Sequence, residues 1–97
     1  MTLLPPDEVD AALARRSSGW TRDGDELVTV RTGPDFAAAM TFVVAVAALA
    51  EEADHHPDID IRWNTVTLRL TTHSAGGLTG KDLDLAAAVD GIRPGVD

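Results

Sequence analysis

The sequence predicts an α+β domain, a four-stranded antiparallel sheet with three helices packed on one face, in the order α-β-β-α-β-β-α. Three observations lead to this prediction. The chain has 97 residues, 44% of them hydrophobic, enough for one core between two packed layers, so we expect residues 1–97 to form a single domain. Apolar residues at helical spacing alternate along the chain with runs rich in β-branched residues. The expected strands come in pairs with short connections, which favours antiparallel hairpins.

The first helix is expected from Asp7 to about Arg15. Pro5-Pro6 precedes it, and proline is favoured where a helix begins. Acidic residues near its start and arginines near its end complement the helix dipole. Two strands, 20–22 and 26–32, are expected next, because Asp23-Gly24-Asp25 between them is a typical hairpin turn.

A long central helix is expected from Phe36 to about Asp54. Gly33-Pro34-Asp35 ends the preceding strand and offers helix start signals, and His55-His56-Pro57 ends the helix, because proline disfavours helical geometry in the residue before it. Apolar residues cover more than one side of this helix: Phe36, Met40, Phe42, Val43, Val44, Val46 and Leu49. One sheet face cannot bury them all, so we expect a second copy of the chain to cover the rest.

A second hairpin is expected after this helix, with strands at 59–63 and 66–72 and a tight turn at Asn64-Thr65. The second strand alternates, so one set of side chains faces the core: Val66, Leu68 and Leu70. The other set shares the opposite, polar face: Thr67, Arg69, Thr71 and His73. His73 is therefore expected where this strand ends, facing away from the core.

The last helix is expected to begin after a loop at 74–77, with Thr79 as its N-cap. Thr79 and Asp82 have the spacing of a capping box, which gives Asp82 a structural role that can coexist with a functional one. The apolar residues of this helix that we expect in the core are Leu85, Ala86, Val89 and Ile92.

The composition excludes several function classes. Sixteen acidic residues against eight basic ones give a net charge of −8, which disfavours nucleic acid and anionic membrane surfaces as partners. The chain has no cysteine, which excludes disulfides and thiolate chemistry and suits a reducing compartment. The first residues lack the regions of a secretory signal, and the longest apolar stretch, 42–50, is too short to span a bilayer. We expect a cytoplasmic protein.

The three histidines are the best candidates for chemistry. They lie at positions 55, 56 and 73, within nineteen residues of each other. Imidazole has an unperturbed pKa of about 6.5, so it can donate and accept protons near neutral pH. Glu51 lies four residues before His55, which would place its carboxylate on the same helical face and let it pair with that imidazole. His56 must then point elsewhere, and His73 could meet either one where the helix and strand ends converge.

Other interpretations of these residues stay open. The adjacent histidines could form a solvated helix end, and His73 could be an exposed strand residue. Three imidazoles could bind zinc, although the spacing of known zinc motifs is absent and adjacent histidines do not easily chelate together. Trp20 and Trp63 could each lie in the core or form the wall of a pocket for a flat ligand.

These residues also share fixed separations along the chain. Glu51 precedes His55-His56-Pro57 by three intervening residues, and Trp63, His73 and Asp82 follow after five, nine and eight more. This pattern resembles the signature of the pterin-4a-carbinolamine dehydratases. The similarity covers nearly the whole chain and extends to three further segments: Gly19-Trp20, Thr71-Thr72-His73 and Leu78-Thr79-x-x-Asp82. Ile59 departs from the family pattern, because many members have tryptophan there.

The resemblance implies an oligomeric enzyme, a dimer or a tetramer, with the α+β fold described above. Its expected activity is the dehydration of 4a-hydroxytetrahydropterin to quinonoid dihydropterin, in the recycling of tetrahydrobiopterin, with no metal and no organic cofactor. The expected catalytic residues are His55, His56 and His73. The residues expected to bind or orient the substrate are Glu51, Asp54, Pro57, Trp63, Thr72 and Asp82. Some relatives also bind a transcription factor, so a dimerisation or coactivator module without catalysis is the alternative, and a small metal-binding protein is a second one.

Overall fold

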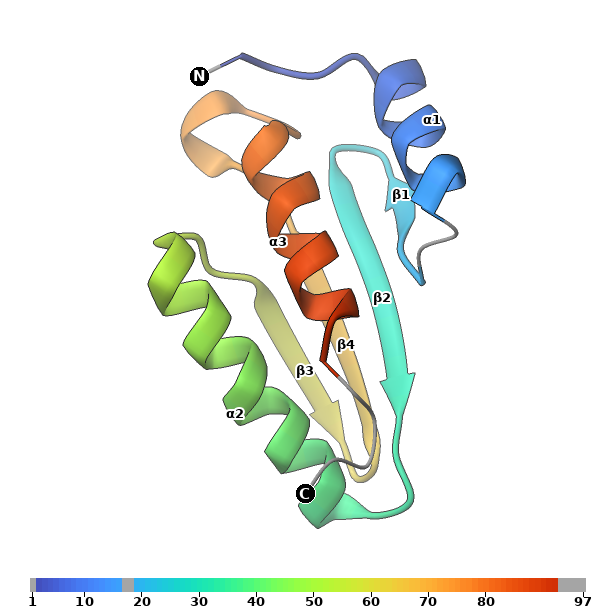
Figure 1. Ribbon diagram of the computed structural model, residues 1–97, viewed down its shortest axis with the longest axis vertical. Helices are drawn as coiled ribbons and strands as arrows, with labels where there is room; N and C mark the ends of the chain where they lie inside the picture. Colours follow the sequence, from blue (N-terminus) through green and yellow to red (C-terminus); the bar gives the residue numbers. More distant parts are fainter. Residues whose placement is uncertain (1, 17–18, 93–97) are drawn as a thin grey trace.

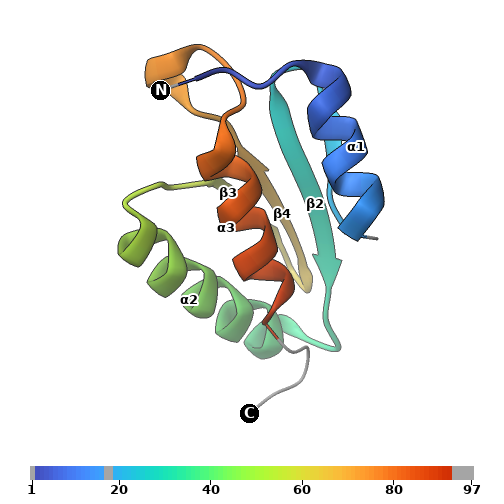
Figure 2. The same ribbon diagram turned by 45° about the horizontal axis from the view of Figure 1, so that its top comes forward.

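The helices and strands follow the expected order (Figure 1). The computed structural model describes residues 2–16 and 19–92. The helices are α1 (Pro6–Arg16), α2 (Phe36–Ala53), the short 3-10 helix η1 (His73–Ala75) and α3 (Gly80–Asp90). The strands are β1 (Thr21–Asp23), β2 (Glu26–Thr32), β3 (Asp58–Arg62) and β4 (Thr65–Leu70). They form one antiparallel sheet in the order β1-β2-β4-β3, and α1, α2 and α3 lie on one of its faces (Figure 2).

The core lies between the sheet and the three helices. The predicted alternation of β4 is confirmed, because Val66, Leu68 and Leu70 are each at most 1% exposed. Helices α1, α2 and α3 bury Val9, Val46 and Leu85 against the same cluster. The buried hydrophobic residues that complete it are Leu13, Trp20, Leu27, Ala39, Leu78, Ala86 and Val89. Of the two tryptophans, Trp20 therefore belongs to the core.

The turn between β3 and β4 lies one residue earlier than expected. Trp63 and Asn64 form it, and β3 covers 58–62 rather than 59–63. Trp63 adopts a left-handed conformation with φ of 50°, which an extended strand cannot contain. Asn64 fixes the turn by donating its side-chain amide to the carbonyl of Gly33, at 2.8 Å. Trp63 is 67% exposed, so it does not belong to the core of the chain.

Strand β4 ends two residues earlier than expected. Beyond Leu70, Thr72 forms only an isolated bridge with Gly77, and η1 begins at His73. The hydroxyl of Thr71 donates to the carbonyl of Asp25 at 2.7 Å, while Thr72 is buried. His73 is therefore not on the polar face of a strand. It is the exposed first residue of a turn that bends back toward α3.

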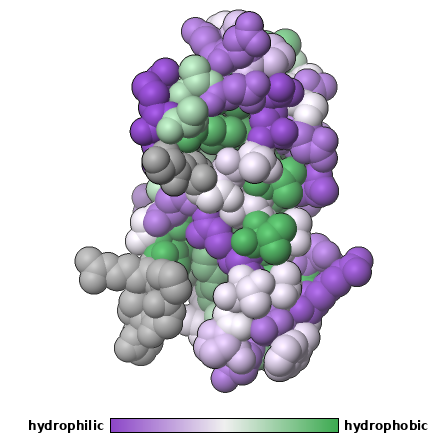
Figure 3. Space-filling view, turned by 90° about the vertical axis from the view of Figure 1, so that its right-hand side faces the viewer, coloured by the Kyte–Doolittle hydropathy of each residue, from purple (hydrophilic) through white to green (hydrophobic). Residues whose placement is uncertain are grey.

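Helix α2 leaves much of its apolar surface uncovered. Only Ala39, Val46 and Ala50 are buried, while Phe36 is 51% and Val44 66% exposed. By length and composition alone the whole helix is apolar enough to cross a membrane, which the prediction from residues 42–50 missed. Figure 3 shows the side of the molecule that lies to the right in Figure 1, where hydrophobic residues form separate patches among hydrophilic ones. On α2, the exposure of Phe36 and Val44 itself provides an apolar surface that another molecule can cover.

Candidate active site

A left-handed residue at the end of α2 determines where the adjacent histidines point. Asp54 has φ 49° and ψ 45°, and its N–H donates to the carbonyls of Ala50 and Glu51. This is an αL cap, which ends a helix and turns the chain sharply. His55 and His56 therefore lie beyond the helix, in the link to β3. The predicted end of the helix, at about Asp54, is confirmed, and Asp54 itself is the capping residue.

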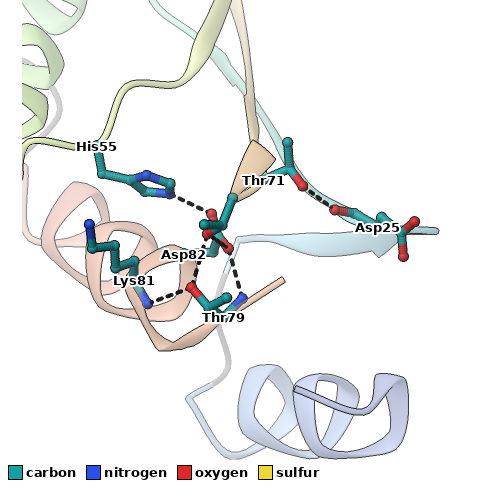
Figure 4. Close-up of polar contacts among 7 residues, drawn as sticks. Asp25, His55, Thr71, Thr79, Lys81 and Asp82 are labelled. Atoms are coloured by element: carbon teal, nitrogen blue, oxygen red, sulfur yellow. Dashed lines mark hydrogen bonds and ion pairs between the residues drawn. The ribbon is translucent and has the colours of Figure 1, made fainter. Parts of the chain in front are cut away.

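His55 points inward and meets the carboxylate of Asp82. Its Nε2 lies 2.6 Å from Oδ1 of Asp82, and the two side chains point toward each other from the link after α2 and from α3 (Figure 4). The imidazole is 10% exposed and the carboxylate fully buried. The other oxygen, Oδ2, accepts from the Thr79 N–H at 2.9 Å and from the Thr72 hydroxyl at 2.7 Å. The predicted capping box is confirmed, and its Asp82 also holds an imidazole.

His56 contacts Glu51, which the sequence led us to expect beside His55. Its Nε2 lies 2.5 Å from Oε2 of Glu51, and both side chains are exposed. The expected pairing of Glu51 with His55 is therefore wrong. A spacing of four residues joins side chains only while the helix continues, and α2 has already ended at Ala53. Each of the adjacent imidazoles has its own carboxylate, one buried and one in solvent.

His73 directly follows a residue of the same carboxylate network in the chain. That residue is Thr72, whose hydroxyl donates to Asp82, so the end of β4 and the end of α2 converge at the first turn of α3. Within the described part of the chain, the His73 ring has no hydrogen-bond partner and is exposed. It is therefore accessible to a ligand.

The remaining expected residues divide into a near and a distant group. Asp54 is exposed at the end of α2, and Pro57 is half-buried between His56 and β3. Trp63 lies at the opposite end of β3, whose five residues span about 16 Å at 3.3 Å each. The fold therefore places Trp63 apart from the histidines of its own chain.

A hollow of about 230 Å³ lies between α2 and α3, next to His55. Its lining residues are Leu49, Glu52, Ala53, His55, Lys81, Asp84, Leu85 and Ala88. Of the three histidines only His55 lines it. Lys81 was not expected in this region from the sequence, although its place two residues after the N-cap Thr79 puts it in the same helical turn as Asp82. Among the described residues, no group of His, Asp and Glu side chains has an arrangement that could hold a metal ion.

The comparisons with known proteins agree with the resemblance seen in the sequence. A family profile described as pterin 4 alpha carbinolamine dehydratase matches residues 2–92. The chain belongs to this family. A relative from Roseiflexus castenholzii, named for this dehydratase, is 63% identical over 90 residues, which are 93% of this chain and 96% of the relative. A Nocardia farcinica protein named in the same way is 53% identical over 89 residues, covering 92% and 94%.

Solved structures with the same fold also come from pterin dehydratases and their relatives. A Brucella melitensis structure described as a transcriptional coactivator/pterin dehydratase has a TM-score of 0.84 and 30% identity, covering 92% of this chain and 96% of its own. A pterin dehydratase-like protein described as a RuBisCO assembly factor in the alpha-carboxysome has a TM-score of 0.59 and 26% identity, with 73% and 82% covered. The predicted fold class is confirmed, and membership of this dehydratase family identifies the chain as an enzyme, a carbon–oxygen hydro-lyase.

Proposed function

We propose that this chain removes water from 4a-hydroxytetrahydropterin and releases quinonoid dihydropterin, in the recycling of tetrahydrobiopterin. The observation that supports this most directly is the pair of adjacent imidazoles with separate carboxylates, His55 on buried Asp82 and His56 on exposed Glu51. Two titratable groups in different surroundings can supply an acid and a base at one pH. The dehydration of a carbinolamine needs both.

The reaction begins at the carbon that carries the hydroxyl. The lone pair of the neighbouring ring nitrogen forms a C=N bond as the C–O bond breaks, and hydroxide alone is a poor leaving group. A protonated imidazole therefore donates a proton to the departing oxygen, which leaves as water. The cationic ring then gives up a proton from nitrogen to a neutral imidazole. The net reaction is the loss of one water molecule from the pterin. It proceeds by proton transfers and uses no metal or organic cofactor.

The roles follow from where each imidazole lies. His55 and His73 act at the hydroxyl, as acid or base according to the face that the substrate presents. His73 suits this role because it is exposed and adjoins the Thr72–Asp82 contact that leads to His55. His56 holds the ring and accepts its proton, while Glu51 and Asp82 orient the two imidazoles that they contact.

Stopped-flow absorbance with chemically generated 4a-hydroxytetrahydropterin tests the proposal. The wild-type chain should accelerate the dehydration, and His55→Ala and His73→Ala should each slow turnover by about 10²–10⁴-fold, the range of general acid–base catalysis. Ser74→Ala, the next residue of η1, is the matched control and should keep wild-type turnover. A wild-type chain that leaves the spontaneous rate unchanged, or a fully active His73→Ala chain, contradicts the proposal.

We also propose that the working enzyme is a cytoplasmic homodimer or homotetramer built on α2. The support is the apolar surface of this helix, where Phe36 and Val44 are more than half exposed. A second copy offers the same apolar surface, so two such helices can bury each other. The net charge of −8 and the absence of cysteine support a reducing compartment and no nucleic-acid partner.

A further inference from the structure

We infer that two buried threonines, Thr72 and Thr79, are positioning residues for His55. Their hydroxyls hold Asp82 so that Nε2 of His55 keeps its proton and Nδ1 is the nitrogen that exchanges a proton with the substrate. The catalytic part of this inference rests on the proposed function, while the placement of the protons on His55 does not.

The threonines do not face a ligand. Thr72 is 4% and Thr79 0% exposed, and Asp82 beside them is 0% exposed. Their Oγ1 atoms lie 2.9 Å apart, and Thr72 Oγ1 lies 2.7 Å from Oδ2 of Asp82. Any effect of these hydroxyls on a reaction must therefore pass through the carboxylate.

Donor and acceptor counts fix the direction of every bond in this chain. An ionised carboxylate only accepts hydrogen bonds, so the Thr72 hydroxyl donates its one hydrogen to Asp82. In its contact with Thr79, Thr72 must then accept, and Thr79 donates. The oxygen of Thr79 still accepts from the N–H of Lys81 at 3.3 Å. The order is Lys81 N–H to Thr79, Thr79 to Thr72, and Thr72 to Asp82.

This order determines what Asp82 offers to His55. Oδ2 already accepts two bonds, from Thr72 and from the Thr79 N–H, so the carboxylate is held in one orientation with Oδ1 toward the imidazole. An ionised carboxylate oxygen cannot donate, so at 2.6 Å from Nε2 it accepts a hydrogen from that nitrogen. The hydrogen of the neutral ring therefore lies on Nε2, which leaves Nδ1 as the nitrogen that can accept a proton from a substrate. A buried carboxylate that fixes an imidazole tautomer is an established catalytic device.

Other charged groups also lie near this imidazole. Glu52 of α2 and Lys81 and Asp84 of α3 line the hollow next to His55. All three are exposed, so solvent screens their charges, whereas Asp82 is fully buried. None of the three makes a hydrogen bond with His55 that would choose between its ring nitrogens.

A purely structural role for the threonines is the rival explanation, because Thr79 caps α3. Nitrogen-15 NMR of the imidazole separates the two, since a protonated ring nitrogen and an unprotonated one have distinct shifts. In the wild-type chain, Nε2 of His55 should remain of the protonated type across the titration while only the Nδ1 shift moves. In Thr72→Val, which preserves shape without the hydroxyl, the Nε2 signal should move toward a mixture of tautomers.

The kcat of each threonine variant should change together with the nitrogen-15 shifts of His55. With the pterin carbinolamine, Thr72→Val should lower kcat about tenfold, the scale of one hydrogen bond to a charged group, with KM within about twofold because Thr72 does not touch substrate. Thr72→Ser restores the hydroxyl and should restore both kcat and the shifts. Thr79→Val and Thr79→Ser form a second matched pair and should behave in the same way.

Two results overturn the inference. One is a wild-type chain in which Nδ1 carries the fixed proton and Nε2 titrates, a measurement that needs no variant and so does not depend on whether one folds. The other is a folded Thr72→Val chain with wild-type nitrogen shifts. If the wild-type chain shows the expected shifts but does not dehydrate the carbinolamine, the proposed function fails while the proton placement stands.

Discussion

Nε2 of His55 lies 2.6 Å from Oδ1 of Asp82, although 27 positions separate the two residues in the chain. The contact joins the end of α2 to the first turn of α3. The same carboxylate also completes the capping box that begins α3. One residue therefore serves the fold and the candidate site at once, so a substitution at Asp82 should change stability and activity together.

Asp82→Asn tests this double role. The amide cannot accept on both of its terminal atoms, so either the cap or His55 loses its acceptor. We expect kcat for the carbinolamine to fall by about 10²–10⁴-fold. We also expect the free energy of unfolding to fall by about 1–3 kcal/mol, the cost of a buried polar group without its partner. Stopped-flow absorbance and urea unfolding measure the two effects.

Asp60→Asn is the control for Asp82→Asn, because Asp60 lies on the exposed edge strand β3 and its side chain is 57% exposed. It should leave both quantities close to wild type. An Asp82→Asn chain that loses stability but keeps full kcat would assign Asp82 to the fold alone.

Glu51→Gln tests the second carboxylate, which contacts His56. The amide keeps a hydrogen-bonding group but loses the charge. Both partners are exposed, so solvent weakens their interaction, and we expect kcat to fall by only about twofold to tenfold. The difference in kcat between the wild type and the variant should become smaller as salt is added, because salt screens the charge that the variant lacks. Glu8→Gln on α1 is the control, and a loss as large as that of Asp82→Asn would contradict this account.

The fold could be predicted from the sequence because its elements have local signals. The β1–β2 hairpin was expected from Asp23-Gly24-Asp25, and the capping box was expected from the spacing of Thr79 and Asp82; both form. The β3–β4 turn was placed one residue late because nothing in the residue type of Trp63 indicates a positive φ. That conformation is imposed by the bonds between Asn64 and Gly33, which are distant in the chain.

The sequence led us to expect contacts between imidazoles and carboxylates, but not which carboxylate contacts which imidazole. Glu51 was expected to pair with His55 because helical spacing was assumed to continue past Asp54, which instead adopts the αL conformation. Asp54 gave only a weak signal for this, since αL is an option for aspartate but not a requirement. The contact between His55 and Asp82 depends on how α2 and α3 pack, and single-sequence spacing carries no information about that packing.

Asp54 provides a direct test of the helix end. A residue with a Cβ pays a steric cost in αL that glycine does not, and alanine pays more than aspartate. We expect Asp54→Gly to raise the free energy of unfolding by up to about 1 kcal/mol and Asp54→Ala to lower it by a similar amount. Thermal and urea unfolding measure both. Equal stability of the two variants would mean that this backbone conformation does not limit the stability of α2.

Val44→Asp tests the proposed association through α2. A charge at a position that is 66% exposed costs little within one chain but is unfavourable in an apolar interface. By light scattering, we expect a wild-type mass of two or four times 10.2 kDa and a smaller mass for this variant. Val30→Asp on the open sheet face, where Val30 is 58% exposed, is the matched control and should keep the wild-type mass. A monomeric wild type that binds lipid vesicles would instead assign the surface of α2 to a membrane.

Asp10 and Arg22 give the chain a predictable response to acid. The guanidinium of Arg22 donates to both carboxylate oxygens of Asp10, at 2.8 and 3.1 Å, and this hydrogen bonding lowers the pKa of Asp10 below its usual value. As the pH falls, Asp10 therefore binds a proton at a higher pH in the unfolded chain than in the folded one. The pair stabilises the fold above the unfolded pKa of about 4, and its contribution is lost as the pH falls through the lower folded pKa. Since Asp10 is exposed and Arg22 partly exposed, the effect should be small and should weaken in salt.

Asp10→Asn removes this titration while keeping the shape of the side chain. Urea midpoints from pH 7 down to pH 2 should show the wild type more stable than the variant above about pH 5, with the difference closing below it. Glu8→Gln, on the same helix and without an ion pair among the described residues, should follow the wild-type curve in shape. A difference that stays constant down to pH 2 would mean that the contact between α1 and β1 depends on the shape of the Asp10 side chain rather than on its charge.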